Sequence, residues 1–210
     1  MIFENAKTIF LHVPKTAGNA IQNQLIRFSD DIKDISSHQD GVDRFDVKGR
    51  VTPQKHAKLQ DYADRMDISG YKIAITCRNP FDRLISFYFS PHRWQVEEDG
   101  GWKAKMPYWD RDIFRSILPT VKPIVEYLTV NQSVVSPDIV IRFEDIEAGY
   151  LKLGTMVSGS APVPRLNSVN ATFAAQEEIN RAMNDPLTLE TAVELFRADY
   201  EMFGYEIPNH

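Results

Sequence analysis

A strand-to-helix junction near the start of the printed sequence constrains the fold most strongly. Residues 8–13 are mostly apolar and β-branched, which predicts a buried strand. A Pro-Lys-Thr turn follows, and apolar side chains then recur with helical spacing at Ile21, Leu25 and Phe28. Such a junction exposes backbone N–H groups at the positive end of a helix, and Lys15 adds a full charge. The segment therefore predicts an anion site.

The order of residues distinguishes this junction from a Walker A loop. That loop is Gly-x-x-x-x-Gly-Lys-Ser/Thr, whereas here Lys15 precedes Gly18. The sequence also has no His-Glu-x-x-His, no Cys-x-x-Cys and no acidic cluster with ligand spacing, so we expect no metal. A nucleotide kinase would use Mg²⁺ beside a Walker A loop, and these features weigh against it.

A second junction follows the apolar residues 72–77, which predict another buried strand. The helix expected after it has an apolar stripe of Phe81, Leu84, Ile85 and Tyr88. Ser86 lies off this stripe, and helical side chains lean toward the N-terminus, so we expect its hydroxyl near Arg78 at the strand end. An Arg fork and a hydroxyl at one junction suit a phosphate monoester.

These two junctions resemble those of the sulfotransferases, in particular the carbohydrate sulfotransferase group called sulfotransferase family 2. The order His-Val-Pro-Lys-Thr-Ala-Gly at residues 12–18 is similar to the loop with which that family holds the 5′-phosphosulfate of 3′-phosphoadenosine 5′-phosphosulfate (PAPS). Arg78 and Ser86 match the family's Arg and Ser, eight residues apart, that hold the 3′-phosphate. Where the family usually carries threonine or serine, this chain has Asn19 and Ala20, so fewer hydroxyl groups are expected around the sulfonate.

The resemblance extends through residues 140–146, 164–168 and 199–205, and is weakest over residues 33–70. It implies a set of donor-binding residues, to which we add Arg165 as a further cation. They are Lys15, Thr16, Ala17, Gly18, Asn19, Ala20, Arg78, Ser86 and Arg165. Because the net charge is −5, attraction of an anionic donor must come from such local groups, and Arg83 is one further cation that we consider.

Sulfonate transfer to a hydroxyl is an in-line displacement at sulfur, which needs a leaving-group stabiliser and a base. We predict that the Lys15 ammonium stabilises the leaving phosphate, supported by backbone N–H groups of residues 16–19. We predict that His56 is the base, since residues 51–57 suggest a helix start with Thr52 as N-cap and Pro53 at the first position.

A histidine in the first helical turn would stay neutral near pH 7 because the helix dipole disfavours the imidazolium. The Lys55-His56 pair is also similar to one seen in this group of sulfotransferases. His12 is the competing base, although its place in the donor loop suggests a role in shaping that loop. Glu144 and Asp145 remain further alternatives, because related sulfotransferases use carboxylate bases.

The length of 210 residues and the order of elements predict a single sulfotransferase domain over residues 1–210. Strands at 8–13, 72–77 and 138–143 alternate with helices, which predicts an α/β fold. We expect a P-loop-like three-layer sandwich, with a parallel central sheet flanked by helices on both faces. The helices are expected at 18–28, 53–66, 81–90, 110–118, 121–131, 145–157, 173–184 and 187–201.

Composition bounds the location and partners of the protein. No apolar run is long enough for a membrane span, and residues 1–7 do not resemble a signal peptide. The single cysteine, Cys77, cannot form an internal disulfide. We therefore expect a cytoplasmic protein, from a bacterium, that binds no nucleic acid, since its net charge has the wrong sign.

The acceptor is expected to be a hydroxyl-bearing saccharide. Two groups of residues are predicted to line its cleft: Lys33, Arg44, Lys48 and Arg50, and a later loop with Arg93, Trp94, Trp102, Lys103, Lys105, Tyr108 and Trp109. Aromatic faces stack on sugar rings and cations suit acidic groups, although the aromatic residues equally suit a hydrophobic core. Two other functions stay open: a non-catalytic domain that binds 3′-phosphoadenosine 5′-phosphate (PAP), and a P-loop-like nucleotide kinase.

Overall fold

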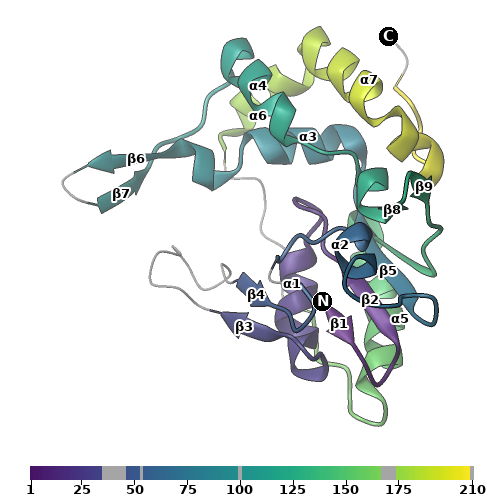
Figure 1. Cartoon of the computed structure of the whole chain (residues 1–210). Helices are drawn as coiled ribbons and strands as arrows, with labels where there is room; N and C mark the ends of the chain where they lie inside the picture. Colours follow the sequence, from purple (N-terminus) through teal and green to yellow (C-terminus); the bar gives the residue numbers. More distant parts are fainter. Residues whose placement is uncertain (35–45, 53, 99–100, 167–173, 209–210) are drawn as a thin grey trace. The chain divides into compact units, whose positions relative to one another are not determined.

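The computed structural model describes residues 1–34, 46–52, 54–98, 101–166 and 174–208 (Figure 1). The chain forms two compact units. Unit 1 comprises Met1–Arg78 and Ile124–Val169, and unit 2 comprises Asn79–Pro123 and Asn170–His210. Each unit has its own hydrophobic core. The expectation of one domain over residues 1–210 stays a prediction.

Unit 1 is built on a four-stranded sheet in the order β1-β2-β5-β10. The strands are β1 (Ile2–Phe3), β2 (Thr8–Leu11), β5 (Lys72–Cys77) and β10 (Ile139–Arg142). The last three are parallel, whereas β1 runs antiparallel to β2. The α/β class is confirmed, but the prediction of an all-parallel sheet is wrong at β1. The chain reverses there in a tight turn, in which the Lys7 N–H donates to the Glu4 carbonyl at 3.1 Å.

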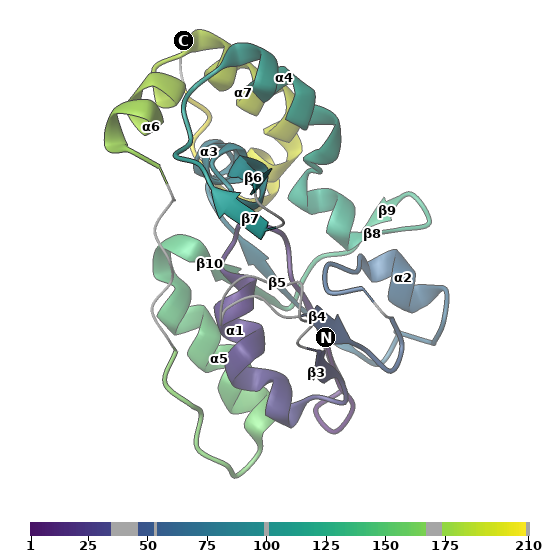
Figure 2. The ribbon, with the colours of Figure 1, turned by 90° about the vertical axis from the view of Figure 1, so that its left-hand side faces the viewer.

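Helices cover the two faces of this sheet. On one face, α1 (Gly18–Leu25) and α5 (Ile146–Ser158) pack against β2, β5 and β10, and α2 (Leu59–Ala63) lies on the other side (Figure 2). The core of the first face is formed by Phe10, Ile21, Leu25, Ala74, Ile141, Tyr150 and Leu153. The helical spacing in the sequence therefore correctly identified the buried stripe of α1.

Short elements complete unit 1. They are two hairpins, β3 (Ile32–Asp34) with β4 (Asp46–Lys48) and β8 (Thr129–Val130) with β9 (Ser133–Val134), and three 3-10 turns, at Ile26–Phe28, Ile124–Leu128 and Phe143–Asp145. The predicted helix over 121–131 is only a 3-10 turn over Ile124–Leu128, after which the chain enters β8. Asn131 and Gln132 have φ of 48° and 66°, and this left-handed pair forms the tight turn of a hairpin.

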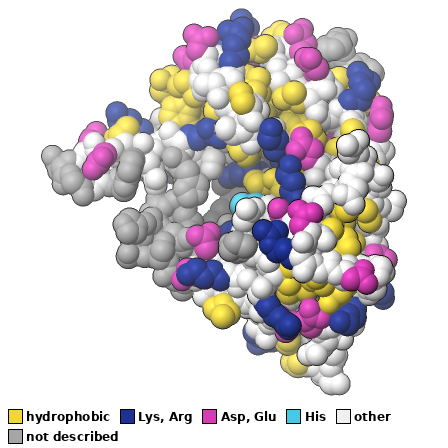
Figure 3. Space-filling model, viewed as in Figure 1, with side chains coloured by type: hydrophobic (Ala, Val, Ile, Leu, Met, Phe, Trp, Pro, Cys, Tyr) yellow, Lys and Arg dark blue, Asp and Glu magenta, His cyan; other side chains and the backbone are white. Residues whose placement is uncertain are grey.

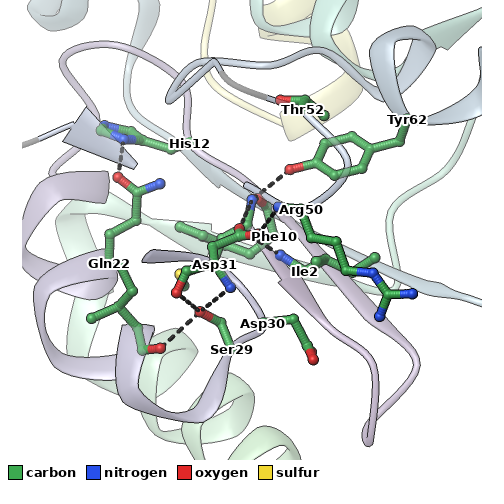
Figure 4. Close-up of polar contacts among 12 residues, drawn as sticks. Ile2, Phe10, His12, Gln22, Ser29, Asp30, Asp31, Arg50, Thr52 and Tyr62 are labelled. Carbon is green, nitrogen blue, oxygen red and sulfur yellow. Dashed lines mark hydrogen bonds and ion pairs between the residues drawn. The ribbon is translucent and has the colours of Figure 1, made fainter. Parts of the chain in front are cut away.

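A buried polar network joins three elements of unit 1 (Figure 4). The Met1 ammonium donates to the Phe10 carbonyl at 2.9 Å and to the Tyr62 hydroxyl at 2.6 Å. It lies 3.7 Å from Asp31 Oδ2, which also accepts from the Ile2 N–H at 3.0 Å. Burial lowers the pKa of the ammonium to about 6, against the opposing attraction of Asp31. The network ties β1 to β2, the strand that precedes the predicted anion loop.

Unit 2 is mainly helical. It contains α3 (Pro80–Tyr88), α4 (Arg111–Ile117), α6 (Gln176–Met183) and α7 (Pro186–Phe203), the hairpin β6 (Gln95–Glu98) with β7 (Gly101–Ala104), and 3-10 turns at Pro91–Trp94 and Leu118–Thr120 (Figure 1). Its core includes Leu84, Tyr88, Trp94, Phe114, Phe196 and Tyr200. None of the helices described in the chain is both long and apolar enough to cross a membrane.

The core of unit 2 also holds one of the cations considered for donor binding. Arg83 is 1% exposed, its Nη2 donates to the Lys122 carbonyl at 2.8 Å, and its Nη1 lies 3.9 Å from the Asp199 carboxylate. Arg83 is therefore a structural residue of unit 2, and the suggestion that it binds the donor is wrong. Asp199 lies in residues 199–205, the last segment in which the sequence resembles the sulfotransferases. Its ion pair with Arg83 gives it a structural role in the core of unit 2.

Candidate functional site

The predicted anion loop lies between the end of β2 at Leu11 and the start of α1 at Gly18. Lys15 and Ala17 are left-handed, with φ of 69° and 65°, whereas Thr16 between them is not. Alternation of this kind turns successive N–H groups toward one side and makes an anion-binding nest. Ala17 is also the N-cap of α1 and makes no side-chain cap, so no capping side chain competes with an anion for the first N–H groups.

The Thr16 hydroxyl points into the protein. It donates to the Val13 carbonyl at 2.7 Å and lies 2.6 Å from the Thr76 hydroxyl, and the residue is fully buried. These contacts tie the loop to the neighbouring strand β5. The Thr16 hydroxyl is therefore already engaged within the protein.

The His12 ring covers the start of α1. It is 4% exposed, and its Nδ1 lies 2.7 Å from the Gln22 side-chain oxygen, one turn into the helix (Figure 4). With the amide in this orientation its oxygen accepts, and the matching tautomer of His12 carries its hydrogen on Nδ1. Burial, and to a lesser degree the nearby His56 and Lys55, lower the pKa of His12 well below its ordinary value. His12 is thus a neutral ring that is fixed in the loop.

Gly18 leaves the space that the His12 ring occupies. A Cβ on residue 18 would lie 2.0 Å from His12 Cδ2 and 2.6 Å from Nε2. We expect Gly18→Ala to lower the free energy of unfolding by about 1–3 kcal/mol through overpacking, although alanine is the better helix former. Urea denaturation measures this change. Gly70→Ala is the matched control, because a Cβ there meets nothing within 4 Å; a stabilised Gly18→Ala variant would contradict the expectation.

His56 lies beside this ring, but not in a helix. The segment that was expected to begin a helix at Thr52 is a turn, in which the Thr52 hydroxyl accepts from the Gln54 N–H at 3.2 Å. Helix α2 begins only at Leu59, where the Asp61 carboxylate accepts from the Lys58 N–H at 2.7 Å. The predictions of a Thr52 cap and of a helix dipole acting on His56 are wrong. Pro53 lies outside the described residues.

The contacts of His56 make it suited to accept a proton. Its Nδ1–H donates to the His12 carbonyl at 3.0 Å, and the two rings meet edge to face with centroids 4.4 Å apart. Because Nδ1 is the donor, the lone pair of the neutral ring lies on Nε2. The residue is exposed, and histidine atoms reach the surface in Figure 3.

The neutrality that was predicted for His56 has another cause than a helix. Partial desolvation by the surrounding protein lowers its pKa, and the charges of Lys55 and Lys15 act in the same direction. The bond to the His12 carbonyl and the charge of Asp46 oppose this shift. The influence of Lys15 also shows that the predicted leaving-group stabiliser and the predicted base lie near each other in unit 1.

Arg78 lies against the same loop. It follows the last residue of β5, its Nη1 is 3.5 Å from the Lys15 carbonyl, and its guanidinium lies 4.1 Å from the centre of the Phe143 ring. Stacking on an aromatic ring keeps the planar fork oriented. Ser86 belongs to unit 2, where it is 8% exposed on α3. The joint contact of Arg78 and Ser86 with one phosphate stays a prediction.

Comparison with known proteins now decides the family. The model of the sulfotransferase family matches residues 1–105, half of the chain, which include the anion loop, His56, Arg78 and Ser86. The chain belongs to the sulfotransferase family. This confirms the resemblance to sulfotransferase family 2 and identifies a transferase. No curated protein and no solved structure matches the chain significantly.

The other residues assigned to the sulfotransferase site differ in their exposure. Arg165 is exposed in the segment after α5, and Glu144 and Asp145, the alternative bases, are exposed on the turn after β10. Asn19 and Ala20 are partly buried in the first turn of α1. The roles of all these residues stay predictions.

The predicted acceptor residues have varied surroundings. The Lys33 ammonium donates to Asn23 Oδ1 at 2.8 Å, and Lys48 forms an exposed ion pair with Asp34. In unit 2, Trp94 is a core residue, and Trp109 packs on the core and donates to the Asp185 carboxylate at 3.0 Å. For these two tryptophans the core interpretation is confirmed. Arg44 and the Trp102 side chain lie outside the described residues.

Lys55 was predicted only as the neighbour of His56, and its own electrostatic environment is a further feature of unit 1. Its pKa is lowered to about 8, mainly because it is partly desolvated and further because of the Lys33 charge, with Asp46 opposing. A partly buried lysine with another cation nearby would gain from an anionic ligand. The sequence feature that could have identified Lys55 is the Lys55-His56 pair, which served above only to support the assignment of the histidine.

Proposed function

We propose that this sulfotransferase transfers the sulfonate of PAPS to a hydroxyl of a carbohydrate or glycan. The observation that carries the proposal is the uncapped start of α1, with left-handed Lys15 and Ala17, beside a neutral histidine. An anion nest and a base in one place are what sulfonate transfer requires. The strand-loop-helix order of β2 and α1 also supports a P-loop-like three-layer fold.

The reaction that we propose is a displacement in line. The acceptor oxygen forms a bond to sulfur as the bond from sulfur to the 5′-phosphate oxygen breaks. The electron pair of the broken bond remains on that phosphate oxygen, and PAP leaves. Lys15 and the N–H groups at the start of α1 stabilise the charge that develops on this oxygen. The acceptor proton moves to Nε2 of His56.

The donor's 3′-phosphate is assigned to Arg78 and Ser86, and Arg165 adds a further cation to the donor site. Support comes from Arg78, whose side chain lies against the donor loop. We also propose that the protein is cytoplasmic and bacterial, that it uses no metal, and that it binds no nucleic acid, as composition and motifs predict.

A non-catalytic PAP-binding domain is the second candidate, because a specific observation favours it. The Thr16 hydroxyl is engaged within the protein, and Asn19 and Ala20 lack hydroxyls, so few hydroxyl groups face a sulfonate. Calorimetry with PAP, ATP and ADP, with and without Mg²⁺, tests the nucleotide. Metal-independent binding of PAP supports both the sulfotransferase and the non-catalytic PAP-binding domain, whereas Mg²⁺-dependent binding of ATP would indicate a nucleotide kinase. Transfer from labelled PAPS to a glycan panel then separates enzyme from binder.

We expect Arg78→Ala to weaken binding of PAP far more than binding of AMP, which lacks the 3′-phosphate. A charge-assisted bidentate contact contributes about 1.5–3 kcal/mol, so the loss for PAP should be about 10- to 150-fold. Calorimetry measures both ligands. Lys72→Ala, at the opposite end of β5, is the control. Equal losses for PAP and AMP would make Arg78 a structural residue of the loop.

A further inference from the structure

Two histidines and a glutamine form a continuous chain of contacts in unit 1. The Gln22 side-chain oxygen accepts from His12 Nδ1 at 2.7 Å, and the His12 carbonyl accepts from His56 Nδ1 at 3.0 Å. Gln22 is fully buried and His12 is 4% exposed, whereas His56 is exposed. These contacts therefore lead from the interior of α1 to the surface residue assigned as the base. Figure 4 shows the inner contact, between Gln22 and His12.

Each contact of this chain selects one tautomer. The His12 backbone carbonyl can only accept, so His56 carries its hydrogen on Nδ1 when neutral. The Gln22 amide, with its oxygen turned toward His12, selects the same tautomer for that ring. The His12 ring is further held by Gly18, where even one methyl group would overlap it. The His12 carbonyl thus belongs to a residue that cannot turn without losing its buried partner.

Gln22 has no other polar role in the described structure. Its Nε2 is buried without a hydrogen-bond acceptor among the described residues. An unsatisfied buried donor destabilises the folded protein. Among the described residues, the one polar interaction of the Gln22 side chain is the one that orients His12, which indicates that this interaction serves the site.

We propose that Gln22 and His12 are positioning residues for His56, which leave its Nε2 as the nitrogen that takes the acceptor proton. The catalytic meaning of this inference rests on the proposed function, but the arrangement of the tautomers does not. The outer partner of a catalytic histidine acts in this way when it fixes the ring and its tautomer.

The charged groups around the two rings are consistent with this role. His12 faces His56, Lys55 and the Met1 ammonium, and all of them oppose a positive charge on its ring. His56 faces Lys55 and Lys15, with Asp46 as the one acidic neighbour. A charge on His12 would lie beside the His56 ring and hinder its protonation, so His12 must stay neutral for His56 to act.

The test compares Gln22→Met with Gln24→Met, a control on the same helix, in the full chain without ligand. Long-range ¹⁵N–¹H NMR reports which ring nitrogen of each histidine carries hydrogen. We expect both rings of the wild type to carry it on Nδ1, and Gln22→Met to give a mixture of tautomers at His12 and a changed titration of His56. Gln24→Met should match the wild type. Unchanged tautomers in Gln22→Met would overturn the proposal.

Kinetics supply a second readout. With labelled PAPS and a glycan panel, we expect Gln22→Met to lower kcat about 10- to 100-fold. The affinity for PAP should stay within about twofold, because the change acts on the acceptor side. An equal loss of PAP affinity would instead indicate damage to the donor loop, and would contradict a positioning role.

Gln22→Glu keeps an acceptor at the same place and covers the case in which Gln22→Met does not fold. It should retain the Nδ1–H tautomer of His12 but raise the pKa of that ring, because a carboxylate favours the imidazolium. A His12 tautomer in Gln22→Glu that differs from the wild type would contradict the proposed chain of hydrogen bonds from Gln22 to His56. If the wild type transfers no sulfonate at all, the proposed function fails while the NMR result still decides the arrangement of the rings.

Discussion

Turnover of His56→Ala is expected to fall roughly 10²–10⁴-fold, while the affinity for PAP stays nearly unchanged. The reason is that the proton accepted by Nε2 belongs to the acceptor and not to the donor. The hydrogen bond from His56 Nδ1 to the His12 carbonyl leaves Nε2 as the basic atom. Labelled-sulfonate transfer measures turnover, and calorimetry measures PAP binding.

The pH–rate profile gives His56 a distinct signature. Desolvation lowers its pKa, so the neutral ring persists below the ordinary value of a histidine, and activity is lost as the pH falls through this lowered pKa. The acidic limb should disappear in His56→Ala. His92→Ala, at a histidine outside the predicted site, is the control. If His56→Ala keeps full turnover, the base must be sought at Glu144, Asp145 or His12.

Replacing Lys15 is expected to lower turnover by about 10²–10³-fold, more than it lowers the affinity for the donor. Negative charge on the leaving oxygen is greatest in the transition state, so an ammonium beside it contributes most there. Lys15→Met is the preferred variant. It removes the charge but keeps an unbranched side chain at a left-handed position, where φ is 69°.

The matched control for this substitution is Lys7→Met. Lys7 is also left-handed, with φ of 44°, but it lies in the turn between β1 and β2. The two variants therefore carry the same backbone preference, and only one removes a charge from the anion loop. A Lys15→Met enzyme with unchanged kcat and a raised KM would reduce Lys15 to a residue that only binds the donor.

Several elements followed from local sequence pattern. The strand predicted over residues 72–77 has the same bounds as β5. The apolar side chains at Ile21 and Leu25 lie on the buried face of α1. Helix α4 was expected at 110–118 and spans Arg111–Ile117, after an Asp110 cap. In each case the hydrophobic period or the capping residue lies within the element itself, so neighbours in sequence suffice to specify it.

The elements that were missed depend on other parts of the chain. Residues 53–58 carry helix-like signals, yet the Thr52 hydroxyl bonds within a turn and His56 bonds to His12, so the helix begins at Leu59. The hairpins of unit 1 are short, and pairs of two or three residues leave little hydrophobic alternation to detect.

The sequence by itself was enough to recognise the family and to predict the anion loop and the residue types of the site. Tertiary structure decided which partners those residues contact. It turned the Thr16 hydroxyl toward Thr76, stacked Arg78 on Phe143, and set His56 against the His12 carbonyl. These partners are separated by 44 to 65 residues in the sequence, and sheet register and loop packing bring them together. Spacing along the chain can name such side chains, but their hydrogen bonds and desolvation arise only when the distant segments pack.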